Sequence, residues 1–181
     1  MELIHNSLTT KSKKQFYSTP NPYEHQIGYY RAVRHGSSIF VSGTTAVALD
    51  HQSPLQTHTA TGPQIQYPGD AKRQTIVALK ECLKAIEALT FAHRYSSAEN
   101  DQAPSSLSAA ASIVRVRMFV ANQKDCVAVG EGFREVLGKG NGSEYGYEGI
   151  GAAATMIVVP GGFVHDEMLV EIEVDAIVEE D

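Results

Sequence analysis

The sequence predicts an α+β protein in which two helices pack on one face of a mixed β-sheet. Segments 113–120 and 168–178 alternate between apolar and charged residues with the period of two that indicates half-buried strands. Segments 70–90 and 122–137 carry apolar residues at helical spacing. The predicted order is two strands, a helix, a strand, a helix and two final strands, which is an α+β pattern.

The overall composition suits one domain, because 181 residues with 43% hydrophobic content can bury a real core. We expect that domain over residues 23–181, after a flexible polar arm over residues 1–22. Long polar stretches near 46–68 and 94–108 are predicted to be inserts on its surface. The net charge of -6 argues against nucleic-acid binding, which needs a basic surface.

The two cysteines, Cys82 and Cys126, lack metal-type spacing and indicate a reduced intracellular protein without a bound metal. The N-terminus has no apolar run of the kind found in secretory signals, and no segment approaches the roughly 20 apolar residues of a membrane span. The sequence therefore predicts a cytoplasmic protein that does not bind membranes.

A β-hairpin is predicted near the start, from strands over 28–34 and 38–44 that are separated by His-Gly-Ser. Tyr29 and Arg31 fall on one face of its first strand. Both side chains donate hydrogen bonds, so together they could clamp a ligand carboxylate. The alternative is that Tyr29 is a half-buried sheet aromatic and Arg31 a surface residue.

The first helix is predicted from a cap at Asp70 to about Thr90. A second helix follows the strand over 113–120, with Asn122 or Asp125 as its cap and Gly138 just past its end. The glycine-rich segment 138–151 fits either a mobile lid over a ligand or a simple linker, because its glycines match no phosphate-binding spacing.

The last long apolar run predicts two strands, 152–159 and 168–178, joined as a hairpin by a tight turn at Gly161 and Gly162. On the second strand three carboxylates, Glu171, Glu173 and Asp175, share one face and repel each other. A cationic neighbour is therefore expected. Arg117 on the strand over 113–120 is the predicted partner of Glu171, although the arginines of that strand could equally neutralise all three carboxylates.

These segments together resemble the reactive-intermediate deaminase family, also called RidA or YjgF-like. The likeness lies in GYYRAVRHGSSIFVSGTTA, VRVRMFV, VGEGFREVLG, AAATMIVV and LVEIEVDAIV, taken in that order. The resemblance implies a fold like that of the small bacterial chorismate mutase and a homotrimer with ligand sites between subunits. It also implies a cofactor-free hydrolase that deaminates reactive enamines and imines.

Carried over residue by residue, the resemblance implies that Tyr29 stacks on the ligand and Glu171 activates the water. It places a family serine at Ser42 and the backbone that helps hold the water near Met156. One departure stands out, since the family's carboxylate-binding arginine, in a Pro-Ala-Arg-Ser/Thr pattern, falls on Ala154 just before Thr155. Losing this charge-assisted contact would weaken binding of amino-acid-derived imines tenfold or more.

The leading functional hypothesis is a cofactor-free enzyme acting on an enamine, an imine or a related activated intermediate of specialised metabolism. Glu171 would be its general acid or base, with Arg31, Arg115 or Arg117 as a substitute cation. Backbone amides near Ala154, Thr155 and Met156 would steady the developing charge. The alternative is a non-catalytic trimer that binds a small molecule. An endoribonuclease is disfavoured by the acidic balance.

Overall fold

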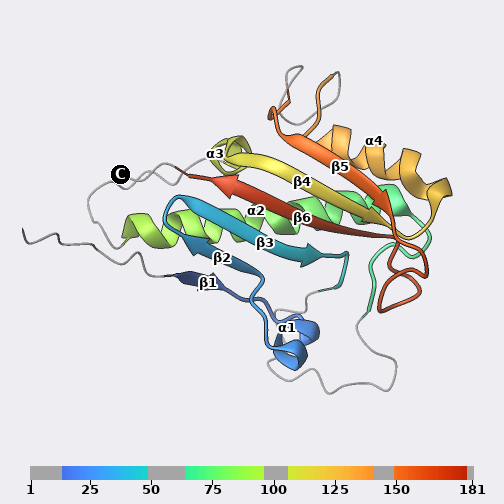
Figure 1. Ribbon diagram of the computed structural model, residues 1–181, viewed down its shortest axis with the longest axis horizontal. Coiled ribbons are helices and arrows are strands. Elements are labelled where there is room, and N and C mark those ends of the chain that lie inside the picture. The colour runs from blue at the N-terminus through green and yellow to red at the C-terminus, as the bar shows by residue number, and fades with distance from the viewer. Residues whose placement is uncertain (1–13, 49–63, 96–105, 141–148, 179–181) are drawn as a thin grey trace, which may run out of the picture.

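The computed structural model describes residues 14–48, 64–95, 106–140 and 149–178, with side chains from Phe91 to Tyr95 and from Ser106 to Ser108 left aside. The described strands form one six-stranded sheet in the order β1-β2-β3-β6-β4-β5 (Figure 1). They are β1 (Gln15–Tyr17), β2 (Ala32–His35), β3 (Ser38–Thr44), β4 (Ile113–Val120), β5 (Ala153–Val158) and β6 (Val170–Ile177).

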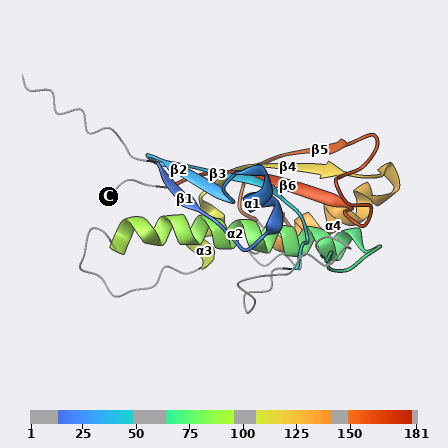
Figure 2. The ribbon, with the colours of Figure 1, turned by 90° about the horizontal axis from the view of Figure 1, so that it is seen from below.

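The helices are α1 (Pro22–Ile27), α2 (Ala71–Tyr95), α3 (Ser106–Ala111) and α4 (Cys126–Val136), with a 3-10 turn η1 (Gln123–Asp125) before α4. Viewed along the sheet, α2 and α4 lie on the same side of it (Figure 2). The predicted α+β class, with its mixed sheet and helices on one face, is therefore confirmed. No helix in the described part of the chain is both long and apolar enough to cross a membrane.

Strand β6 has the predicted alternation and fills the middle of the sheet between β3 and β4. Its apolar residues are almost fully buried against the helical layer, where they meet the apolar stripe of α2. These strand residues are Val170, Ile172, Val174 and Ala176. The opposite face of β6 carries the three carboxylates, so the period of two separates the core from a charged surface.

The prediction that the last two strands pair as a hairpin is wrong. Strand β5 pairs parallel to β4, and β6 pairs antiparallel to both β3 and β4, so β4 lies between β5 and β6. Gly161 and Gly162 do turn the chain with positive φ values, but the chain then crosses β4. This order places the strongly amphipathic β6 over the helices and leaves the weakly patterned β5, which is largely exposed, at the sheet edge.

Two further details differ from the sequence prediction. The pairing of β4 with β6 shifts register between Ile113 and Arg115, so Ile113 is buried while Val114, expected on the apolar face, is 43% exposed. Neither Asn122 nor Asp125 caps α4 through its side chain, because η1 precedes that helix and the Asn122 side chain donates to Asp125 instead. Asp70 does accept from the Arg73 amide at the start of α2, as predicted.

Residues 15–17 of the predicted arm form strand β1 and so belong to the sheet. Within the described part, β1 pairs antiparallel with β2, and Asn21 caps α1 by accepting a hydrogen bond from the Tyr23 amide. Because α1 ends at Gly28 in a left-handed conformation, β2 begins at Ala32 and not near residue 28. The β2–β3 hairpin itself is confirmed.

The predicted inserts fall largely outside the described residues, as do residues 141–148 of the glycine-rich segment. At the edges of the first insert, Val47 and Ile65 form an isolated antiparallel bridge and are buried. At the edges of the second, α2 extends to Tyr95 and α3 begins at Ser106. The described edges of both inserts therefore belong to the folded domain.

Two glycines of α4 give a matched test of helix packing. A Cβ built on Gly132 would lie 2.7 Å from the Lys72 carbonyl oxygen of α2, whereas one on Gly130 would find its nearest neighbour, Met156 Cε, at 3.9 Å. We expect Gly132→Ala to lower the free energy of unfolding by about 1–3 kcal/mol through overpacking. We expect Gly130→Ala to raise it by about 0.5–1 kcal/mol through helix propensity. Equal effects in urea unfolding would contradict the close α2–α4 contact.

Candidate functional site

The candidate site is centred on Glu171, which β6 places on the face of the sheet opposite the helices. Glu171 pairs with Phe119 of β4 on one side. On the other side the pairing register of β3 shifts between Val41 and Thr44. A Cβ built on Gly43, within that shift, would lie 2.7 Å from Glu171 Cδ. The carboxylate therefore occupies the space that a side chain at position 43 would fill.

The surroundings of Glu171 favour its protonated form. Burial raises the pKa of this carboxyl, and the neighbouring Glu173 carboxylate raises it further, while the Arg31 guanidinium partly opposes both effects. The largest cause is removal of the carboxylate from water. Such a carboxyl exchanges its proton closer to neutral pH than an exposed glutamate does, which suits a general acid or base.

Tyr29 lies in the same electrostatic neighbourhood. The residue is half-buried in the segment between α1 and β2. Burial raises the pKa of its hydroxyl, Arg31 lowers it, and the carboxylates of Glu24 and Glu171 raise it. Tyr29 and Glu171, the two residues predicted to be catalytic, are therefore close enough for the Glu171 carboxylate to contribute to the raised pKa of the Tyr29 hydroxyl.

Arg31 is buried and hydrogen-bonded within the protein, so the predicted surface position is wrong. The residue is only 3% exposed, so it is not a surface residue. Its Nε donates to Glu24 Oε1 at 2.9 Å, and its Nη1 donates to the Gly43 carbonyl at 3.0 Å and to Thr44 Oγ1 at 2.7 Å. These donors are directed at the protein, which argues against Arg31 as a clamp for a ligand carboxylate.

Ser42 adjoins this arginine network, because its amide donates to the Arg31 carbonyl at 2.9 Å. The residue is half-buried on β3, directly before Gly43, and its hydroxyl donates to the Tyr30 carbonyl at 2.8 Å. Ser42 therefore borders the Glu171 site, and its hydroxyl helps to hold the backbone next to Tyr29.

Arg117 pairs with other carboxylates than the predicted one. Its guanidinium donates to Glu173 at 3.0 Å and to Asp175 at 2.7 Å, because Glu173 is its cross-strand neighbour and Phe119 is opposite Glu171. The expected cationic neighbour is therefore present for Glu173 and Asp175. Glu171 makes no ion pair with any described residue. This carboxyl is the one of the three left available for chemistry.

The predicted site residues on β5 lie apart from Glu171. Ala154 and Met156 pair with Val116 and Met118, whose side chains point toward the helices, and Thr155 pairs with Arg117. Ala154 is offset from Glu171 by three residues along β4 and by two strand spacings, or about 10 Å in each direction. One chain therefore does not gather all the predicted site residues into one pocket.

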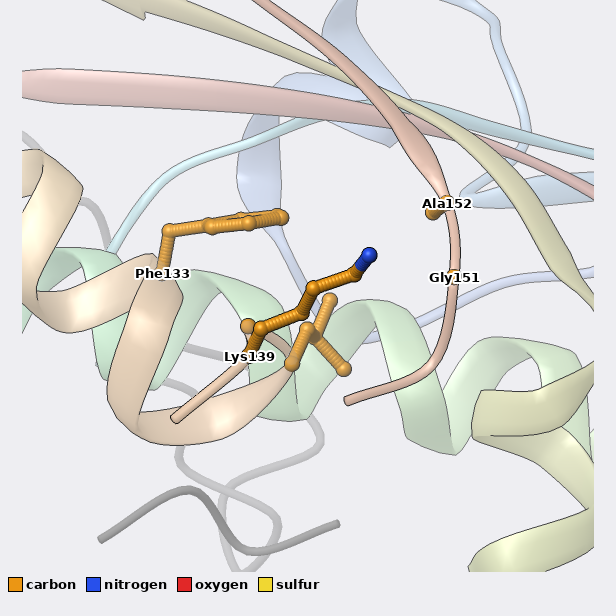
Figure 3. A pocket seen from close by; sticks show the side chains of 6 residues that line it. Phe133, Lys139, Gly151 and Ala152 are labelled. Carbon is orange, nitrogen blue, oxygen red and sulfur yellow. The ribbon is translucent and has the colours of Figure 1, made fainter. Parts of the chain in front are cut away.

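A separate pocket of about 290 Å³ lies on the helical side, between the C-terminal end of α4 and the start of β5. It is lined by Phe133, Leu137, Gly138, Lys139, Gly151 and Ala152. Figure 3 shows the Lys139 side chain extending between the Phe133 ring and Ala152. This hollow is on the opposite side of the sheet from Glu171 and is not part of the Glu171 site. Within the described part of the chain, no His, Cys, Asp and Glu cluster could hold a metal ion.

Sequence reasoning missed two residues of the site, Glu24 and Gly43. Glu24 is 5% exposed and holds Arg31, but nothing in its sequence context distinguishes it from a surface glutamate of a short helix. Gly43 was detectable, because a glycine inside a strand pattern often marks a shifted register or a close approach by another group.

Comparison with known proteins supports this fold. No family model matches the chain. An uncharacterized Streptomyces coelicolor protein is 26% identical over 156 residues, which is 86% of each chain. The crystal structure of Rv2704 from Mycobacterium tuberculosis, a YjgF/YER057c/UK114 family member, matches with a TM-score of 0.59 and 25% identity over 92% of this chain and 100% of that one. A Yersinia pestis protein of the Rid family, YyfA, matches with a TM-score of 0.55 and 18% identity over 92% and 100%.

The six-stranded mixed sheet with helices on one face is the α+β fold of these family structures. These structural neighbours belong to the YjgF/YER057c/UK114 and Rid families, in agreement with the resemblance predicted from the sequence.

The contact between Gly43 and Glu171 can be tested by adding a methyl group at position 43, where it would occupy the space now taken by the Glu171 carboxylate. We expect Gly43→Ala to keep the fold, because the displaced group is the flexible end of a side chain, and to turn the carboxylate into water. The pKa of the Glu171 carboxyl should then fall toward its ordinary value, since burial is the main cause of its rise. A pH titration followed by NMR of labelled glutamate side chains measures this. A titration unchanged from that of the wild type would refute the contact, and Gly130→Ala is the matched control.

Proposed function

We propose that the protein is a cofactor-free enzyme that transfers a proton to or from a small activated molecule of the imine or enamine class. The observation that supports this most is Glu171, a half-buried carboxyl with a raised pKa that lies over Gly43 and has no ion pair among the described residues. A carboxyl in this state can protonate an imine nitrogen or accept a proton from an attacking water. Hydrolysis of the imine would then release ammonia or an amine.

Tyr29 would orient the substrate in this proposal. Its ring lies half-buried near Glu171, and its hydroxyl keeps its proton because burial raises its pKa. The hydroxyl is then a hydrogen-bond donor throughout the working pH range. Ser42, whose hydroxyl is held by the Tyr30 carbonyl, would keep the backbone beside the ring in place.

A second copy of the chain would complete the site. Within one chain Ala154 lies about 10 Å from Glu171 both along and across the strands, and all of β5 is two strand spacings, or about 10 Å, away across the sheet. The β5 edge is also largely exposed, with Ile157 at 51% and Val158 at 37%. An exposed apolar edge strand favours association. We therefore include the expected homotrimer in the proposal, with Ala154, Thr155 and Met156 of one copy facing Glu171 of another.

The substrate in this proposal is not a simple 2-imino acid. Position 154 carries no guanidinium, and the guanidinium groups of Arg31 and Arg117 are hydrogen-bonded to the carboxylates of Glu24 and of Glu173 and Asp175. A substrate carboxylate would find neither arginine unoccupied. The site thus favours imines or enamines whose binding depends on shape and on the tyrosine.

The test is ammonia or amine release from freshly generated imines, comparing 2-iminobutyrate with imines that lack a carboxylate. We expect the second group to be the better substrates, and Glu171→Gln to lower kcat by about 10²–10⁴-fold. Glu173→Gln is the matched control on the same face of β6, and it should retain most of the activity because Glu173 pairs with Arg117. Full activity in Glu171→Gln would remove the catalytic carboxylate.

A non-catalytic small-molecule-binding trimer is the second candidate. The observation that favours it is the network of Arg117, Glu173 and Asp175, in which the arginine neutralises charge beside Glu171 on the same face of the sheet. Binding of imine analogues by calorimetry with no turnover across the panel would support it over the enzyme.

A further inference from the structure

The buried ion pair between Glu24 and Arg31 is the most unusual electrostatic feature of the described chain. Their side chains are each 4% exposed, with 2.9 Å between Arg31 Nε and Glu24 Oε1. Glu24 also accepts from the Thr19 amide at 2.8 Å and from the Thr19 hydroxyl at 2.6 Å. The carboxylate thus has three donors, so its charge is fully satisfied inside the protein.

Arg31 connects this pair to the irregular end of β3. Its Nη1 donates both to the Gly43 carbonyl and to Thr44 Oγ1. Thr44 Oγ1 in turn donates to the Ser42 carbonyl at 2.8 Å. The guanidinium and the threonine together hold the backbone from Ser42 to Thr44, which includes the glycine beneath the Glu171 carboxylate.

A contribution to the free energy of unfolding does not by itself account for the buried ion pair between Glu24 and Arg31. Removing two charges from water costs about as much as their attraction returns, so a buried pair is weak grounds for expecting a more stable fold. In some proteins a buried polar or ionic group instead fixes one arrangement where several are possible. The arrangement fixed here is the shifted register of β3 between Val41 and Thr44.

We propose that Arg31 and Glu24 are positioning residues that hold Gly43 beneath the Glu171 carboxylate and thereby set where that carboxylate points. The catalytic consequence rests on the proposed function, in which Glu171 transfers the proton. Arg31 itself touches no substrate in this arrangement, because its described donors go to Glu24, Gly43 and Thr44.

Only a few titratable or charged groups among the described residues influence Glu171, so a change in its titration can be assigned to a cause. Tyr29 and Arg31 face it from the segment before β2, and Glu173 adjoins it on its own strand. Strand β3 contributes Gly43 and strand β4 contributes Phe119, neither of which titrates. A change in the titration of Glu171 therefore reports on Arg31, on Tyr29 or on the position of the carboxylate.

The test uses the double variant Glu24→Gln/Arg31→Gln in the full chain, which removes both charges together and leaves no unpaired ion buried. The control is Lys72→Gln/Glu135→Gln, which removes the half-exposed pair between α2 and α4 at 2.9 Å. The readouts are the NMR titration of the Glu171 side chain, identified with Glu171→Gln, and the pH profile of kcat on the best imine substrate.

We expect the double variant to move the Glu171 titration to higher pH, as expected from loss of the opposing Arg31 charge, and to lower kcat about 10–100-fold. The control should do neither. Should the double variant not fold, Arg31→Lys replaces it, because lysine keeps the charge but not the rigid fork that joins Glu24 to Gly43. Arg31→Lys is expected to lower kcat and to alter the titration, since the position changes while the charge remains.

The two proposals fail in different ways. If Glu171→Gln is as active as the wild type but Arg31→Lys, which keeps the charge, still moves the Glu171 titration, the proposed function fails and the positioning role is supported. If Glu171→Gln loses activity while a folded double variant or Arg31→Lys keeps both the wild-type titration and the wild-type pH profile, the positioning role is overturned.

Discussion

The alternation of strand β6 is the constraint on which the rest of the structure depends. This strand pairs with both β3 and β4, so its two faces become the two faces of the central sheet. Val170, Ile172 and Val174 of this strand are buried against the helices. Because side chains alternate along a strand, the three carboxylates at Glu171, Glu173 and Asp175 must lie on the opposite face of the sheet. A register slip of one residue would bury three carboxylates. The hydrophobic core therefore fixes where the acidic residues lie.

The three carboxylates then differ because their neighbours differ. Strand β4 places Arg117 opposite Glu173 and within reach of Asp175, but it places Phe119 opposite Glu171. On the other side, β3 offers Glu171 a glycine in a shifted register, which makes room for its carboxyl over the backbone. The three carboxylates look equivalent in the sequence. Glu171 alone is half-buried without an ion pair to a described residue, because core packing sets its face, the β4–β6 register places Phe119 opposite it, and Gly43 has no side chain to fill the space above the backbone.

Much of this was readable from sequence. The period of two in 168–178 and 113–120 predicted the charged and apolar faces, and the arginine-bearing strand was expected beside the carboxylates, where it lies. The pairing of Arg117 was mispredicted because alternation fixes a face but not the register between two strands. The order of β5 and β6 was mispredicted because a glycine turn between two apolar runs does not show whether a third strand lies between them.

The N-terminal region shows a different limit. Glu24 was indistinguishable from a surface acid, because only the three-dimensional contact with Arg31 reveals that it is buried. Arg31 was expected either at the surface or at a ligand, whereas it is buried with its described hydrogen bonds made to Glu24, Gly43 and Thr44. Residues such as Glu24 and Arg31, which act by fixing the position of other residues, have no pattern in the sequence that identifies them. Gly43 was detectable, because a glycine within a strand suggests that another group approaches its backbone closely.

The most direct measurement of the central claim is the pH dependence of unfolding for the wild type and for Glu171→Gln. Burial raises the pKa of Glu171 in the folded state, so the folded protein holds this proton more tightly than the unfolded chain does. The stabilisation is complete below the unfolded pKa and is lost as pH rises through the folded pKa. The account predicts that Glu171→Gln gains stability relative to the wild type as pH rises through this window. A difference that is constant with pH, or that grows in the wild type's favour, would contradict it.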